Sequence, residues 1–240
     1  MSMHFSDSLS GADVLSNSDT RLAKLGSYRE TADGRGFRYA KVGAVATVAG
    51  KVYQSAALDA TNQTVSGGFA VAAAAIGDTV VTTTATTTLA ANLVAEGFLS
   101  VDVTPGQGHL YQISSHLAAA AAVVSFNLYD PLRVALTTSS RIIVTKHPYD
   151  AIVVEPGTPT GVITGVASHV ITAAYYGWIQ TYGVASVLFT GTGVAGKAVG
   201  SLSGGTSGSS APAIAATNIL GYNVATTITG EYGFVYLTIR

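Results

Sequence analysis

The sequence predicts an all-β protein, barrel- or sandwich-like, with short strands and few or no helices. Three observations lead to this fold class. Valine, threonine and aromatic residues recur in short runs, and 27 glycines and 6 prolines punctuate the 240-residue chain. No stretch shows the apolar period and capping residues that mark a helix. β-branched and aromatic side chains suit pleated strands, and many short strands between turn signals are typical of sandwiches and barrels.

The chain divides into an arm and a larger domain. Residues 1–24 are expected to form a flexible N-terminal arm, because they are polar and lack the basic start and apolar run of a signal peptide. Residues 25–240 are expected to form a β-rich domain, with two subdomains split near 130–160 as the alternative. A Gly/Ser-rich stretch at 204–212 is expected to be a loop, because a strand signal follows it.

Turn signals place the strands in order. Asp33-Gly34 tolerates positive φ and is flanked by strand-type residues, which predicts a hairpin over Leu25–Val42. Alternating residues on both sides of Pro105-Gly106 predict a second hairpin over Phe98–His116. The later strands are expected within Arg141–Gly157, as two strands broken at Pro148, within Tyr175–Gly191, as two aromatic-rich strands broken at Gly183, and at Phe234–Arg240 as an alternating closing strand.

Two stretches have the composition closest to a helix. They are the alanine run Leu117–Ala122 and part of Thr88–Gly97. Neither has clear caps.

Charged residues are scarce. They make up 10% of the chain, against about 25% in an ordinary soluble domain. Such a surface favours association, so we expect neighbouring subunits to cover much of it. The alternative is a compact β-protein whose exposed strands use Thr and Ser in place of charge. A net charge of −1 does not fit a general nucleic-acid binder, and the longest apolar runs are too short for a membrane helix.

The basic residues are concentrated near the N-terminus. Seven of the twelve lie between Arg21 and Lys51, whereas residues 52–132 hold no Lys or Arg and five acids. Opposite patches of this kind favour docking in one orientation, although ordinary surface scatter would give the same count.

The stretch Gly191–Ala198, GTGVAGKA, fits two phosphate-binding patterns, G-x-x-x-x-G-K and G-x-G-x-x-G. A P-loop needs a Ser or Thr after its lysine, and here Ala198 follows Lys197. Both patterns need a helix after the loop, and the sequence that follows is a poor helix former. The stretch is therefore interpreted as a glycine-rich turn.

Other chemical motifs give no positive signal. The chain has no cysteine, no G-x-S-x-G elbow and no histidine pair at metal-binding spacing. We therefore expect no enzyme, no catalytic residue, no metal and no cofactor. The aromatic residues Tyr176, Trp178 and Tyr182 are expected in the core or at a subunit interface, with stacking on a sugar or a base as the alternative.

Several blocks resemble tailed-phage virion proteins. DGRGFRYAKVGAVATVAGKVYQ resembles a segment near the N-terminus of that group, where a Gly-Arg-x-Phe-Arg-Tyr strand leads into a Gly-Ala turn. EGFLSVDVTPGQGHLYQISSH, PLRVALTTSSRIIVTKHPYDAIVV and YYGWIQTYGVASVLF look like its later blocks. ILGYNVATTITGEYGFVYLTIR is similar to the last hairpin of capsid decoration proteins. Together the blocks cover most of residues 25–240, and none of them is catalytic.

This resemblance implies a decoration or cement protein on the outer surface of a phage capsid. Its partners would be the major capsid protein and copies of itself, with a homotrimer as the expected form, and neither nucleic acid nor membrane. The N-terminal arm with Arg29, Arg35, Arg38 and Lys41 is expected to contact the capsid. Two alternatives stay open, a tail or head-fibre component and a β-rich carbohydrate-binding module that uses Tyr176 and Trp178.

Overall fold

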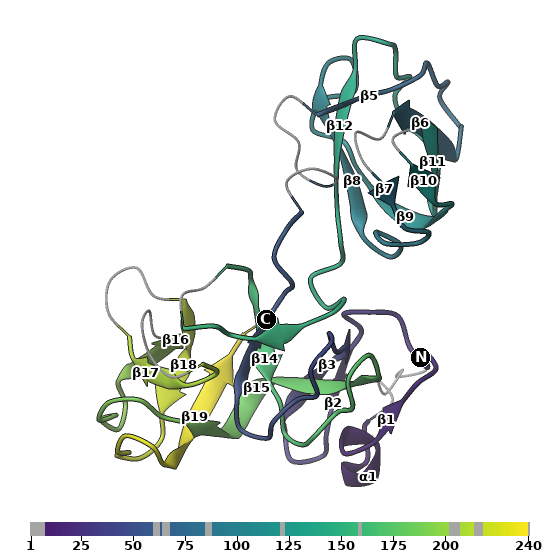
Figure 1. The fold of residues 1–240 in the computed structure, drawn as a ribbon. Coiled ribbons are helices and arrows are strands. Elements are labelled where there is room, and N and C mark those ends of the chain that lie inside the picture. Colours follow the sequence, from purple (N-terminus) through teal and green to yellow (C-terminus); the bar gives the residue numbers. More distant parts are fainter. Residues whose placement is uncertain are drawn as a thin grey trace, which may run out of the picture. The chain divides into compact units, whose positions relative to one another are not determined.

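The computed structural model describes residues 8–59, 63, 68–84, 88–120, 123–157, 160–201, 207–213 and 218–239. Within these residues the regular structure is almost entirely β-strand, which confirms the predicted all-β class, and α1 (Gly11–Val14) is the one helix (Figure 1). The chain folds into two compact units. We call Met1–Ala57 with Pro148–Arg240 the main unit, and Leu58–His147 the inserted unit.

The division of the chain is therefore an insertion. A single split near 130–160 was the alternative that the sequence offered, whereas the chain is divided twice, after Ala57 and after His147. The two units also have separate cores, because one cluster of buried apolar residues lies wholly within the inserted unit and three lie wholly within the main unit.

The inserted unit is an antiparallel sheet of six strands whose two ends meet. The strand order is β5-β12-β8-β9-β11-β6. Val71, just after β5, pairs with Thr83 of β6, and the Ala72 amide donates to the Thr82 carbonyl at 2.8 Å. The six strands are β5 (Phe69–Ala70), β6 (Val80–Thr84), β8 (Phe98–Val103), β9 (Leu110–His116), β11 (Val123–Leu128) and β12 (Arg141–Thr145).

Alternation along these strands fills the interior with apolar side chains. In β11 the side chains of Val124, Phe126 and Leu128 are buried, and those between them are exposed. Successive side chains of a strand point to opposite faces, so every second residue reaches the core. The hairpin predicted around Pro105-Gly106 is confirmed, since β8 and β9 pair as antiparallel neighbours.

Neither of the two stretches with helix-like composition forms a helix. Ala119–Ala120 is the short strand β10, which pairs with β7 (Thr88–Leu89), and residues 121 and 122 lie outside the described residues. Residues 91–96 form turns, in which Asn92 has φ 57° and Glu96 has φ 65°. These left-handed angles are incompatible with a right-handed helix.

The main unit contains a single sheet of eleven strands. Its main path runs β13-β4-β14-β15-β19-β18-β16-β17; β1 and β3 pair with β15, and β2 pairs with β3. The Val52 amide of β4 donates to the Gly208 carbonyl at 2.8 Å, and Ser210 of β17 bridges Phe189, so the last strand returns to the first part of the sheet. The strands are β1 (Asn17–Ser18), β2 (Tyr28–Glu30), β3 (Gly36–Lys41), β4 (Val52–Gln54), β13 (Val153–Val154), β14 (Ile163–Val166), β15 (Tyr176–Leu188), β16 (Ala198–Ser201), β17 (Ser210–Pro212), β18 (Ile219–Asn223) and β19 (Tyr232–Thr238).

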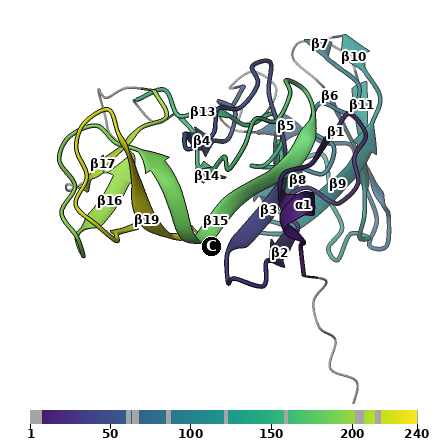
Figure 2. The ribbon, with the colours of Figure 1, turned by 90° about the horizontal axis from the view of Figure 1, so that it is seen from below.

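The strand β15 links the two halves of the main unit. It was expected as two strands broken at Gly183, and that prediction is wrong: β15 is one strand of 13 residues (Figure 2). Residues 176–182 pair with β3 and residues 182–188 pair with β19. Gly183 has φ 81°, an angle that glycine adopts without steric cost, so the strand changes partner there without ending.

The segment 8–24, expected as part of a flexible arm, belongs to the fold. Ser10 and Asp13 form a capping box at the start of α1, in which the Asp13 amide donates to the Ser10 hydroxyl at 3.1 Å. Leu9 and Val14 are buried against Trp178 and its neighbours, and β1 pairs with β15. The expectation of an arm reaching to residue 24 is therefore corrected, and residues 1–7 lie outside the described residues.

Candidate interaction site

The glycine-rich stretch Gly191–Ala198 is a turn between two strands. The Gly193 amide donates to the Thr227 carbonyl at 3.0 Å, and Ala198 begins β16. Phosphate loops of both kinds place the anion at the N-terminus of a helix, and a strand occupies that position here. Within the described ranges, no group of three or more His, Asp or Glu side chains is placed to hold a metal, and no helix is long and apolar enough to cross a membrane.

The predicted hairpin of β2 and β3 carries the four cations expected to contact a capsid, three on its strands and Arg35 between them. Arg29 lies opposite Phe37 across the strand pair, and Lys41, at the end of β3, shares that face. Arg38 points to the other face, and Arg35 lies beside the turn. The four side chains therefore do not form one patch but flank the hairpin on both faces.

Each of these cations lies over an aromatic ring. Such contacts contribute about 0.5–1 kcal/mol at exposed sites and keep the cation in one place while water still reaches it. All four residues are half-buried, so their charges are held in position at the surface. The pairs, with the distance from the cationic group to the ring centroid, are Arg29 over Trp178 (5.6 Å), Arg35 over Phe37 (5.6 Å), Arg38 over Tyr28 (5.5 Å) and Lys41 over Tyr176 (5.6 Å).

Arg38 is the most firmly anchored of the four. Its Nη1 donates to the Gly26 carbonyl at 2.7 Å, and its guanidinium also lies 5.8 Å from the ring centre of Tyr149. Burial raises the pKa of Tyr149 to about 12, and the nearby Arg38 charge opposes that shift. Tyr149 therefore stays a neutral phenol that packs against the arginine at physiological pH.

The three aromatic residues predicted for the core or an interface lie in two places: Tyr176 and Trp178 belong to one aromatic cluster, and Tyr182 contacts Tyr236. Trp178 is only 6% exposed and meets Tyr39 edge-on, with 5.1 Å between ring centroids. Tyr176 stacks on Tyr39, with 6.0 Å between the ring centroids. A hollow of about 150 Å³ beside them is also lined by Arg29 and Asp13. Trp178 is thus a core residue of the main unit.

A larger hollow, of about 510 Å³, lies along the second half of β15. Its lining is mostly apolar, with an arginine and a buried amide, and we call it the β15 groove. The residues that matter most for its character are Arg35, Val48, Val170, Gln180, Val184 and Tyr232.

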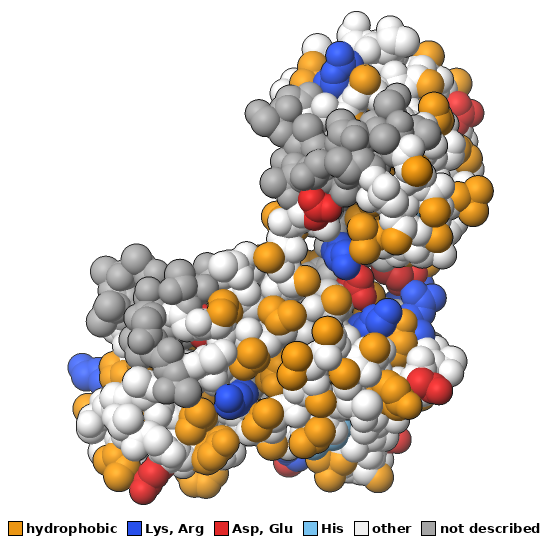
Figure 3. Space-filling model, in the orientation of Figure 1, with side chains coloured by type: hydrophobic (Ala, Val, Ile, Leu, Met, Phe, Trp, Pro, Cys, Tyr) orange, Lys and Arg blue, Asp and Glu red, His pale blue; other side chains and the backbone are white. Residues whose placement is uncertain are grey.

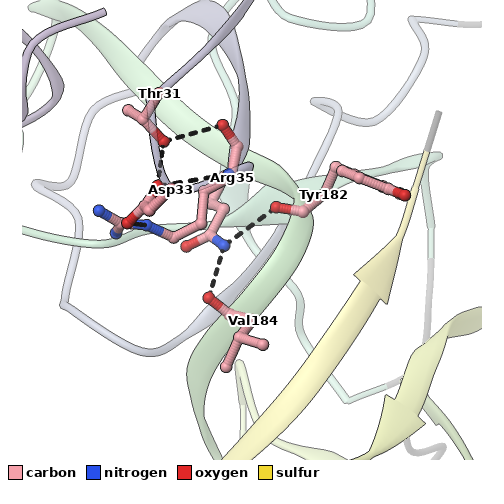
Figure 4. Close-up of polar contacts among 6 residues, drawn as sticks. Thr31, Asp33, Arg35, Tyr182 and Val184 are labelled. Carbon is pink, nitrogen blue, oxygen red and sulfur yellow. Dashed lines mark hydrogen bonds and ion pairs between the residues drawn. The ribbon is translucent and has the colours of Figure 1, made fainter.

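Polar contacts fix the wall of the β15 groove (Figure 4). Arg35 donates from Nε to the Asp33 carboxylate at 2.8 Å, and the Thr31 hydroxyl also contacts that carboxylate. These contacts lower the pKa of Asp33, with the Thr31 hydroxyl as the largest cause. Gln180 donates from Nε2 to the Tyr182 and Val184 carbonyls at 3.1 and 2.9 Å, which braces the backbone on both sides of Gly183.

Sequence reasoning missed an exposed apolar surface next to this groove. Tyr222, Phe234 and Tyr236 are 39–57% exposed, on the outside of β18 and β19. Tyr182 joins them, because its ring meets Tyr236 edge-on at 5.5 Å and its hydroxyl accepts a 2.9 Å bond from the Tyr236 hydroxyl. A signal was present, since the closing segment FVYLTIR has large apolar residues at both alternating sets of positions, and only one set can face a core.

Comparison with known proteins gives no family assignment: no protein-family model, no curated protein sequence and no solved structure matches the chain.

Proposed function

We propose that this chain is a structural virion protein that binds the outside of a phage capsid shell and stabilises it. The observation that carries the proposal is the β2–β3 hairpin with its four ring-supported cations. Docking on a repeated lattice needs charges that reach the surface yet are fixed in position, because ordering a flexible side chain at an interface costs about 0.5–1.5 kcal/mol. Arg29, Arg35, Arg38 and Lys41 meet that need.

The cores on both sides of the hairpin support the same function. Phe37 and Tyr39 pack toward Trp178 on one face, and Ala40 and Val42 pack toward a second apolar cluster on the other. The cations therefore sit on a rigid element of the main unit. Binding through several copies raises avidity by roughly 10² to 10⁴, so each contact can remain weak.

Charge scarcity fits an assembled protein. In the face of the molecule that Figure 3 shows, charged side chains are few among the hydrophobic and uncharged ones. With 10% charged residues, the chain has little to oppose contact with neighbours. A homotrimer on the capsid surface, with the major capsid protein as partner, remains our proposal for its assembly.

The carbohydrate-binding alternative is weaker. A sugar stacks on an exposed aromatic face, and Trp178 is buried among Leu9, Phe37 and Tyr39. A tail or head-fibre location is compatible with the same hairpin, and electron microscopy of labelled virions distinguishes it from a capsid location.

Shell binding tests the proposal directly. Purified empty shells are mixed with the full chain and sedimented at increasing salt. The double variant Arg29→Gln/Lys41→Gln is expected to bind about tenfold more weakly, since exposed ion pairs contribute up to about 1 kcal/mol each. The single variant Arg38→Gln tests in the same assay whether the opposite face of the hairpin contributes to shell binding.

Lys197→Gln is the control for the loss of a positive charge as such: it removes one charge, as Arg38→Gln does, from an exposed turn before β16. It is expected to bind like the wild type. If the wild-type chain ignores shells, or if the hairpin variants and the control bind equally well, the proposal is wrong. Circular dichroism verifies that every variant is folded, because Arg29 lies over Trp178 and its replacement alters the fluorescence directly.

A further inference from the structure

The outer face of β15, β18 and β19 is apolar and aromatic. Along β19 the side chains of Tyr232, Phe234 and Tyr236 point outward, because Gly233, Val235 and Leu237 between them are buried. A sheet with one face in water normally alternates apolar and polar residues. Here both faces are apolar, so the outer one is expected to be covered in the working protein.

The outward residues form one continuous surface across three neighbouring strands. Tyr236 lies opposite Tyr222 of β18 on one side and opposite Val184 of β15 on the other. Phe234 lies opposite Ser186. We call this surface the outer aromatic face and define it by Tyr182, Val184, Tyr222, Tyr232, Phe234 and Tyr236.

Its area suits a protein partner. Tyr222, Tyr232, Phe234 and Tyr236 are 39–57% exposed. At about 200 Å² per aromatic side chain, they leave roughly 400 Å² of ring surface in water. Val184 and the exposed Val48 and Val170 of the adjoining β15 groove extend this surface. A standard interface buries about 800 Å² on each partner, so the face and the groove supply much of such a contact.

Its charge suits a second copy of the chain in particular. The strands β15, β18 and β19 contain no Asp, Glu, Lys or Arg. When two identical faces meet about a two-fold axis, a charge near the axis meets its own copy, and like charges in contact are destabilising. A charge-free face escapes that repulsion, and its rings can stack on those of a copy. The Tyr236–Tyr182 hydrogen bond holds two rings in place beforehand, which reduces the entropy cost of association.

We propose that copies of this chain associate through the outer aromatic face. The inference deepens the proposed function, since it names the surface for contacts between copies. Its test uses the free protein without shells, so its failure is distinct from a failure of shell binding.

The experiment measures the mass of the full chain in solution over a concentration series. The wild type is expected at a multiple of 24.3 kDa. Phe234→Glu places a charge on both facing copies, and its dissociation constant is expected to rise at least about tenfold, toward the monomer. Val45→Glu is the matched control: Val45 is 76% exposed, belongs to the main unit and lies in none of these strands. It is expected to associate like the wild type.

Two results would overturn the inference. One is a wild-type chain that stays at 24.3 kDa up to about 1 mM. In that case, loss of shell binding by Phe234→Glu would assign the face to the capsid protein instead. The other is a Phe234→Glu variant that keeps the wild-type mass. If this variant does not fold by circular dichroism, Phe234→Thr removes the ring, retains a good strand former and decides the question.

Discussion

Glu155 is a carboxyl group with no access to solvent. One of its oxygens accepts a bond from the Gly157 amide at 3.0 Å, and the other has no hydrogen-bond partner in the part of the chain that the structure describes. Burial raises its pKa above the ordinary 4.5. The folded protein therefore binds this proton more tightly than the unfolded chain. Its contribution to stability is fully present below pH 4.5 and is lost as the pH rises through the raised pKa.

Glu155→Gln is accordingly expected to stabilise the protein at pH 8. The amide oxygen can still accept from Gly157, and no charge has to be buried at that pH, so the free energy of unfolding is expected to rise. At pH 4 the gain should disappear. Urea unfolding followed by Trp178 fluorescence at both pH values measures it. Glu231→Gln, at an exposed position, is the control and should change nothing. Equal destabilisation at both pH values would contradict the argument.

His116, in the inserted unit, contributes to stability with the opposite pH dependence to that of Glu155. Its Nδ1 lies 2.9 Å from the Leu117 carbonyl and its Nε2 accepts from the Val94 amide at 3.2 Å, so the ring is neutral with the proton on Nδ1. Burial lowers the pKa of this histidine. A second proton would have to face the Val94 amide. The stability that His116 contributes is therefore present above pH 6.5 and lost as the pH falls through the lowered pKa.

At the scale of elements, the N-terminal segment is part of the fold. Leu9 is 4% exposed and packs with Val14, Phe37 and Trp178, whereas Leu15, six residues later, is 58% exposed. The capping box at Ser10 orients this short segment.

Leu9→Ala is expected to destabilise the main unit by about 2–5 kcal/mol, because it opens a cavity beside Trp178. Leu15→Ala removes the same atoms from an exposed position and should cost less than about 0.5 kcal/mol. Trp178 is the only tryptophan of the chain, so its fluorescence reports on this cluster during urea unfolding. Equal effects of the two substitutions would show that the segment does not pack as described.

Local signals predicted the elements that depend on neighbours in sequence. The hairpins at Asp33-Gly34 and Pro105-Gly106 are confirmed because the turn residues themselves determine the turn. The same local logic failed at Gly183, where a glycine with positive φ lies inside a strand whose two partners come from distant segments. The buried state of Leu9 was missed for the same reason, since its partners Phe37, Tyr39 and Trp178 lie 28 or more residues away.

At the scale of the whole molecule, two units share the chain but not their cores. The strand β4 (Val52–Gln54) ends just before the inserted unit. Lys and Arg disappear from the sequence after Lys51, but a change in charge does not by itself indicate a domain boundary, so the first crossing at Ala57 was not predicted. The candidate site was predicted in part: the four cations were named, but their separation onto two faces depends on the register of β2 and β3.

Separate cores predict separate responses to mutation. Leu99 is fully buried in the inserted unit, so Leu99→Ala is expected to lower the stability of that unit by about 2–5 kcal/mol. Trp178 belongs to a cluster of the main unit. Calorimetry should thus show one transition shifted, while the Trp178 fluorescence midpoint moves by less. A single transition that shifts as a whole in both measurements would show that the units unfold together.

The pairing of β4 with β13 has one more consequence. Gln54 lies opposite Val153, so the chain leaves the main unit and returns to it at the ends of two hydrogen-bonded neighbours. In effect, residues 58–147 occupy the place of a hairpin loop. A foreign domain whose two ends lie close together could replace these residues, so this junction is a suitable site for domain insertion.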